Sequence, residues 1–221
     1  EGALRAGVQA PAEREEEQDQ ADDRDAEQGE LARADLLAAH RATGPATPHL
    51  ARDGAVIKVA NQAANRHRGP AKVFDTEQAA FQAVSDGRIV AGDVVVVRYQ
   101  GPKGGPGMPE MTHLTSAIVG AGLVEQTALL TDGRFGGGTQ GISVGHISPE
   151  AAADGPLAAL RDGDVVEVDA EANRLHVELS DDELEARLSA VEHPPPRYAT
   201  GVLAKYARLV GSAATGARVR A

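Results

Sequence analysis

With 221 residues the chain is long enough for one ordinary domain and a tail, and its formal net charge of −11 argues against a nucleic-acid partner, because phosphate binding needs clustered Lys and Arg. The absence of cysteine excludes a disulfide framework and any iron–sulfur centre held by this chain alone. No apolar run approaches the roughly 18 residues that would span a bilayer, so we expect a cytoplasmic protein without a membrane contact.

Residues 1–48 are expected to form an acidic tail and linker. Residues 1–35 hold twelve Asp and Glu against four Arg, which gives −8 of the net charge. Such a stretch buries too little apolar surface to offset the entropy of ordering, so we expect it to be disordered or loosely helical. An acidic tail that binds a partner is the alternative. The folded domain is expected to be residues 49–221.

The elements expected up to residue 123 are, in order, a strand (55–60), a polar loop (61–70), a short strand (71–74), a helix (75–87), a strand segment (89–99) with a turn at residues 91–93, and a buried helix (115–123). Asp75 is expected to cap the first helix, because Gln78 completes a capping-box pattern three residues later. Residues 94–97 are four consecutive valines. A continuous β-branched run of this kind suits a strand that is buried on both faces.

The elements expected after residue 126 are a strand (127–130), a second strand (142–147), a helix from Ser148, a hairpin (165–168 and 175–179), a helix opened by Ser180 and an amphipathic helix (200–210). Ser148 is followed by Pro149 and Glu150, and this order is typical of a helix start. Ser180 and Glu183 form a capping box. Strands outnumber helices, so the predicted class is mixed, a β-barrel or curved sheet with helices around it.

Two glycine-rich loops are the expected centre of the chemistry. Residues 101–111 (GPKGGPGMPEM) follow the valine strand and contain one carboxylate, Glu110. Residues 131–141 (TDGRFGGGTQG) contain five glycines, which let another group approach the backbone closely. Main-chain N–H groups in such a loop can hold an anion or a small substrate. The alternative for the second loop is a flexible surface turn.

Three side chains in or near these loops have a functional and a structural interpretation. Glu110 suits magnesium, which one or two carboxylates usually hold together with water and substrate oxygens, or it is a solvent-facing residue near a helix start. His146 suits a general base at neutral pH, or it caps or hydrogen-bonds the helix start expected at Ser148. Arg134 suits bidentate binding of a substrate carboxylate, or it pairs with Asp132.

The second loop also contains a G-x-G-x-x-G match at residues 136–141. This fingerprint of dinucleotide binding requires a helix directly after the loop. Residues 142–144 are strand-like instead, which disfavours a nucleotide-binding domain.

Four long stretches carry a resemblance to a known family: GPKGGPGMPEM, TSAIVGAGL, TDGRFGGGTQGISVGHISPEAA and GPLAALRDGDVVEVD. In this order they resemble the C-terminal domain of the dihydroxy-acid dehydratase family, which also includes phosphogluconate and sugar-acid dehydratases. The resemblance runs from about residue 49 to the end of the chain. It is closer to the dihydroxy-acid branch than to the sugar-acid branches, and residues 1–45 do not share it.

The resemblance implies a hydro-lyase (lyase) that converts a 2,3-dihydroxy carboxylate to a 2-keto acid in branched-chain amino-acid biosynthesis. It implies a swivelling β-barrel domain over a larger N-terminal domain, an iron–sulfur cluster that acts on the leaving hydroxyl, and magnesium on the substrate. Glu110 stands at the family's magnesium-binding glutamate and position 136 at its serine base. The remaining loop and substrate contacts that we expect are Arg134, Gly137, Gly138, Thr139 and His146.

Two departures from the family pattern bear on activity. Position 136 is Gly136, so the base side chain is missing, and the cluster cysteines belong to an N-terminal domain that this sequence does not contain. We therefore expect the isolated chain to be inactive. The expected partner is an N-terminal dehydratase half, which would supply the cluster, or a second copy of the chain in a homodimer. The alternative is a non-catalytic relic or a binding module for a hydroxy acid, magnesium or a protein.

Overall fold

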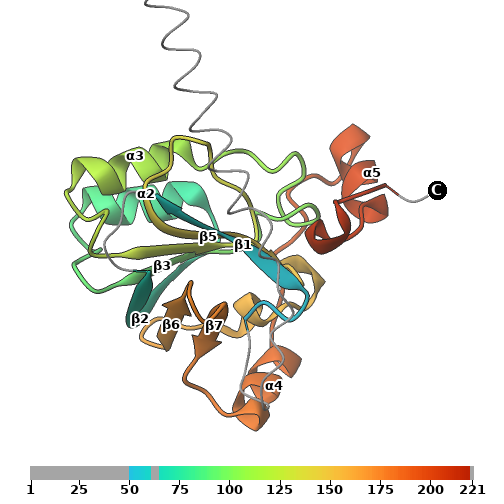
Figure 1. Cartoon of the computed structure of the whole chain (residues 1–221). Coiled ribbons are helices and arrows are strands. Elements are labelled where there is room, and N and C mark those ends of the chain that lie inside the picture. Colours follow the sequence, from blue (N-terminus) through green and yellow to red (C-terminus); the bar gives the residue numbers. More distant parts are fainter. Residues whose placement is uncertain (1–49, 61–64, 220–221) are drawn as a thin grey trace, which may run out of the picture. The chain divides into compact units, whose positions relative to one another are not determined.

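The computed structural model of the chain describes residues 50–60 and 65–219 (Figure 1). The tail and linker predicted for residues 1–48 lie outside the described residues, as does part of the loop predicted at 61–70. In the described part, seven strands form one curled sheet in the order β1-β5-β4-β3-β2-β6-β7, accompanied by helices. The predicted mixed class is confirmed.

The strands are β1 (Gly54–Ala60), β2 (Arg66–Phe74), β3 (Val94–Val97), β4 (Ala128–Thr131), β5 (Gly141–Ser148), β6 (Val165–Asp169) and β7 (Arg174–Val177). The α-helices are α2 (Glu77–Ser85), α3 (Thr112–Gly120), α4 (Asp181–Ser189) and α5 (Gly201–Leu209). Three 3₁₀ turns complete the described part: η1 (Ala151–Ala153), η2 (Pro156–Ala159) and η3 (Ala213–Thr215).

The centre of the sheet is parallel, and this brings the two glycine-rich loops together. Strands β2, β3, β4 and β5 run in the same direction, and Val97 at the end of β3 lies opposite Thr131 at the end of β4. The loops that follow β3 and β4 therefore leave from the same edge of the sheet. Ligands of open parallel sheets bind at this carboxyl edge.

The four valines of β3 form the middle of the core, as predicted. All four are fully buried. Val95 and Val97 pack with α2 and α3, which lie side by side on one face of the sheet (Figure 1). Val94 and Val96 face the opposite way and pack with residues of β6 and β7. The alternation of side chains along a strand thus fills two apolar layers with one short sequence.

Strand boundaries differ from the predictions where side chains or distant strands intervene. The turn predicted at residues 91–93 is confirmed, since the carboxylate of Asp93 accepts from the N–H of Val90 at 2.9 Å and closes it directly before β3. The strand prediction is too long at both ends, because residues 89–90 and 98–99 are not part of a strand. β2 begins at Arg66 rather than at residue 71, because residues 66–70 pair with the distant strand β6.

Two helix predictions are also corrected. The cap of α2 is Thr76, whose hydroxyl accepts from the N–H of Ala79 at 3.2 Å, whereas Asp75 pairs with Arg98 instead. No α-helix begins at Ser148, which ends β5 and is followed only by η1. By contrast, the Ser180 cap is confirmed, since its hydroxyl accepts from the N–H of Glu183 at 3.2 Å. α3 begins at residue 112, three residues earlier than predicted.

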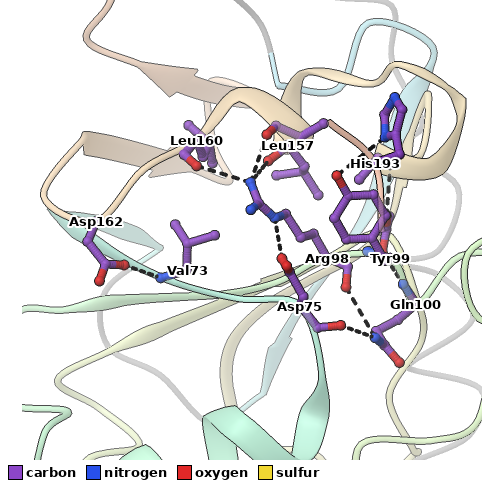
Figure 2. Close-up of polar contacts among 12 residues, drawn as sticks. Val73, Asp75, Arg98, Tyr99, Gln100, Leu157, Leu160, Asp162 and His193 are labelled. Carbon is purple, nitrogen blue, oxygen red and sulfur yellow. Dashed lines mark hydrogen bonds and ion pairs between the residues drawn. The ribbon is translucent and has the colours of Figure 1, made fainter. Parts of the chain in front are cut away.

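Arg98, directly after β3, connects the carboxyl edge of the sheet to η2 by hydrogen bonds (Figure 2). Its Nε donates to Asp75 Oδ1 at 2.6 Å. Its Nη1 donates to the carbonyls of Leu157, Ala158 and Leu160 at 3.3, 2.7 and 3.1 Å. The side chain is only 18% exposed, so these carbonyls have little water to replace the guanidinium.

Replacing Arg98 with methionine should lower the free energy of unfolding by about 2–4 kcal/mol, because the carbonyls of η2 lose a charged donor. Urea denaturation measures the loss. The matched control is Arg88→Met, since Arg88 is 57% exposed and lies 3.5 Å from Asp86. An exposed pair of this kind contributes about 0–1 kcal/mol, so equal losses in the two variants would contradict the assignment.

Candidate functional site

Glu110 and Arg134 join the two loops at the carboxyl edge of the sheet. The backbones of these two residues form an isolated parallel β-bridge. Arg134 Nη1 lies 3.2 Å from Glu110 Oε1, and Arg134 Nε donates to the carbonyl of Met108 at 2.6 Å. Arg134 therefore pairs with Glu110. The interpretation that it pairs with Asp132 is wrong.

Gly136 lies against the carboxylate of Glu110. A Cβ atom built on Gly136 would stand 2.9 Å from Glu110 Oε2. The corresponding positions on Gly137 and Gly138 have no neighbouring atom within 4 Å. Of these three loop positions, only a side chain at 136 would meet the carboxylate, so Glu110 and position 136 share one site.

The other predicted residues of the second loop lie around this site. The N–H of Thr139, which is buried, donates to the carbonyl of Gly136 at 3.2 Å and closes the glycine turn. His146 has a φ of +52° and its N–H donates to the carbonyl of Gly133 at 2.8 Å. Burial lowers the pKa of its imidazole, and the charge of Arg134 lowers it further, which favours the neutral form that a general base needs.

Asp132 is a buried carboxylate that accepts from three N–H groups of two backbone segments. Its Oδ2 accepts from the N–H groups of Tyr99 at 3.0 Å and Ala151 at 2.9 Å, and its Oδ1 accepts from that of Gln100 at 2.8 Å. The side chain is fully buried. Burial raises the pKa of Asp132 to about 6, against the opposing effect of the three N–H donors. Asp132 therefore positions the start of the first loop.

Glu150 occupies the next N–H groups of the same loop. Its carboxylate accepts from the N–H groups of Lys103 at 3.0 Å and Gly104 at 2.9 Å, and burial raises its pKa. The Cα of Gly101 comes so close that an added Cβ would stand 2.5 Å from Glu150 Oε2. The backbone donors at residues 103 and 104 are thus occupied by the protein's own carboxylate. In the sequence, Glu150 has the pattern of a helix start, and nothing in that pattern indicates this contact.

The buried position of Asp132 predicts a pH dependence of stability. Its pKa of about 6 in the folded protein lies above the ordinary value of 3.8 for an aspartate, so the folded protein binds this proton more readily than the unfolded chain. The contribution of Asp132 to the free energy of unfolding is therefore greatest in acid, and it declines as the pH rises through its folded-state pKa of about 6. From about pH 5 to about pH 7 the wild type should lose about 1 kcal/mol relative to an Asp132→Asn variant.

Urea denaturation of both proteins at the two pH values tests this dependence. Comparison with the variant removes the opposite trend of Asp169 and Glu178, whose pKa values are lowered in the folded protein. A difference between the two proteins that stays constant with pH would contradict the prediction.

Lys58 of β1 is a further charged group at the site, and the sequence analysis did not single it out. It lies opposite Ser143 of β5 in the sheet, and its Nζ donates to the carbonyl of Gly137. Burial lowers the pKa of this ammonium. In the sequence Lys58 looks like an ordinary residue of an apolar strand, because its contact lies 79 positions further along the chain.

The described residues offer one carboxylate to a metal at this site. Glu110 is 44% exposed, so one of its oxygens is accessible as a hard ligand. In the described part, no group of three or more His, Cys, Asp or Glu residues could hold a metal ion. The role of Glu110 as a magnesium ligand therefore stays a prediction, whereas a cluster bound by thiolates does not fit this cysteine-free chain. The described helices are all too short or too polar to cross a membrane.

Comparison with known proteins identifies the relatives of the chain. The family Dihydroxy-acid/6-phosphogluconate dehydratase C-terminal matches residues 46–217. The dihydroxy-acid dehydratase of Metallosphaera sedula is 56% identical over 168 residues, and the match covers 76% of this chain and 30% of the relative. The enzyme of the same name from Streptococcus mutans is 56% identical over 169 residues, covering 76% of this chain and 29% of the relative.

The chain thus spans somewhat less than a third of the length of these relatives. The match includes both glycine-rich loops and every strand of the described sheet. The resemblance noted in the sequence is confirmed, and the chain belongs to the dihydroxy-acid/6-phosphogluconate dehydratase family, of which it represents the C-terminal domain.

Proposed function

We propose that residues 49–221 form the swivelling C-terminal domain of a hydro-lyase that converts a 2,3-dihydroxy carboxylate to a 2-keto acid in branched-chain amino-acid biosynthesis. The observation that carries the proposal is the contact between position 136 and Glu110, since a Cβ at 136 would stand 2.9 Å from Glu110 Oε2. Two loops from neighbouring parallel strands would meet in this way if they presented a metal ligand and a proton acceptor to one substrate.

The residues of this chain have distinct tasks in that reaction. Magnesium, when bound, would draw electrons from the substrate's oxygens and so make the proton at C2 more acidic. Glu110 would supply one ligand to it, and Arg134 would hold the Glu110 carboxylate in place. A serine at position 136 would be the proton acceptor, and Gly136 leaves this place in the glycine turn without one. The remaining ligands and the iron–sulfur cluster would come from the part of the enzyme that the chain does not span.

A second function is favoured by Gly136 itself. Glycine has no side chain that could accept a proton, so a chain with Gly136 would bind a hydroxy acid, magnesium or a protein partner without turnover. The two functions share the same site and differ only in the chemical step. The cytoplasmic location expected from the sequence stays a prediction in either case.

Magnesium binding tests the shared site. In titration calorimetry with magnesium and 2,3-dihydroxybutanoate, Glu110→Gln should weaken binding by about tenfold or more, because the amide removes the negative charge from the metal ligand. Glu125→Gln is the matched control, since Glu125 is exposed on the segment between α3 and β4. Equal affinities in the wild type and Glu110→Gln would contradict the assignment of Glu110.

A further inference from the structure

Lys58 is a cation at the glycine turn whose described partner is a neutral group. Its ammonium crosses from β1 to the carbonyl of Gly137, the residue next to Gly136. Among the described residues, the ion pairs with carboxylates do not include Lys58. Its charge is therefore balanced by a carbonyl dipole alone in the described part of the chain.

Arg134, the other cation beside the turn, already has hydrogen-bond and ion-pair partners. Arg134 contacts the carboxylate of Glu110 through Nη1 and the carbonyl of Met108 through Nε. Its positive charge is thus largely compensated. An anion that enters the turn would meet an uncompensated charge at Lys58 and a compensated one at Arg134.

The partial burial of Lys58 makes the difference between its uncompensated charge and the compensated charge of Arg134 more important for an anion. Burial lowers the pKa of Lys58, which means that the ammonium has lost part of its hydration. A charge that has lost water and gained only a carbonyl is stabilised when an anion comes within contact, because a charge-assisted hydrogen bond is about twice as strong as a neutral one. The space for a ligand exists, since the Cβ positions of Gly137 and Gly138 have no atom within 4 Å.

We infer that Lys58 binds the carboxylate of the acidic ligand at the glycine turn and so selects acids over neutral diols. This inference rests on the proposed function for the site, and it adds the residue that recognises the charged end of the ligand. Lys58 and Glu110 approach adjacent residues of the turn with opposite charges. A ligand with a carboxylate at one end and hydroxyls beside it is complementary to that pair.

The test compares an acid with its uncharged amide. Binding of 2,3-dihydroxybutanoate and of 2,3-dihydroxybutanamide is measured by calorimetry with magnesium present, using the whole 221-residue chain. Lys58→Gln should weaken binding of the acid by about 10- to 100-fold, the effect of one hydrogen bond to a charged group. Binding of the amide should stay within about threefold, because glutamine can still donate to the Gly137 carbonyl.

Two further variants separate recognition of charge from support of the loop. Lys58→Arg should keep the preference for the acid, because the positive charge remains. Lys205→Gln removes one charge from an exposed position of α5 and should leave both affinities unchanged. A loss that is equal for acid and amide in Lys58→Gln would show that Lys58 only supports the loop and would overturn the inference. Unchanged binding of the acid would overturn it too.

The outcome is distinguishable from failure of the proposed function. Acid binding that depends on Lys58 but not on Glu110 would overturn the magnesium assignment and support the inference. Acid binding that depends on Glu110 but not on Lys58 would support the magnesium assignment and overturn the inference about Lys58. If the wild type binds neither probe, both fall.

Discussion

Replacing Asp132 with alanine should lower the free energy of unfolding by about 3–5 kcal/mol, one of the two largest effects that we expect from a single substitution here. The carboxylate accepts from the N–H groups of Tyr99, Gln100 and Ala151. Alanine would leave these three donors without an acceptor at a position that is fully buried in the native protein. Each buried donor without a partner costs about 1–3 kcal/mol, and partial relaxation of the loop reduces the sum.

Asp86→Ala is the matched control for this substitution. Asp86 ends α2 and makes surface contacts to Gln82 and Arg88, with 45% of its side chain exposed. Its loss should change the free energy of unfolding by no more than about 1 kcal/mol. In hydrogen exchange, the amides of Tyr99 and Gln100 should be selectively less protected in Asp132→Ala. Similar denaturation curves for both variants would contradict the role of Asp132.

The central features of the fold could be predicted because their causes are local. The valine run of β3 needs burial on both faces wherever it lies, and its four side chains are all fully buried. The two glycine-rich loops were visible for the same reason, since glycine density needs no partner to be recognised. The Ser180 cap depends on contacts only three residues away. Local causes of this kind leave a pattern in the sequence.

The rest depends on partners far along the chain. Glu150 meets the N–H of Gly104 across 46 positions, and Lys58 meets Gly137 across 79. In the sequence Glu150 has the pattern of a helix start and Lys58 that of a strand residue. Asp132 could equally well have paired with Arg134, because adjacent opposite charges are compatible with either arrangement. The resemblance to a family supplied Glu110 and position 136, whereas the groups that position their loops required coordinates.

Restoring serine at position 136 should have the largest effect on activity. If the chain is mixed with a cluster-bearing N-terminal half of a dehydratase, Gly136→Ser should raise the rate of 2-keto acid formation by about 10³-fold or more, the usual effect of regaining a lost base or nucleophile. The new Cβ would stand 2.9 Å from Glu110 Oε2. That oxygen is the end of a flexible, 44% exposed side chain, so it can move slightly to accommodate the serine.

Gly138→Ser provides the control for this gain. It adds the same hydroxyl to the same turn, at a position where no atom, Glu110 included, lies within 4 Å of the added Cβ. Its activity should stay at the level of the parent chain, because a base must lie within hydrogen-bond reach of the proton it removes. No activity in Gly136→Ser would contradict the proposed hydro-lyase. A gain limited to Gly136→Ser that disappears when Glu110→Gln is added would instead show that the carboxylate and the restored hydroxyl act on one substrate.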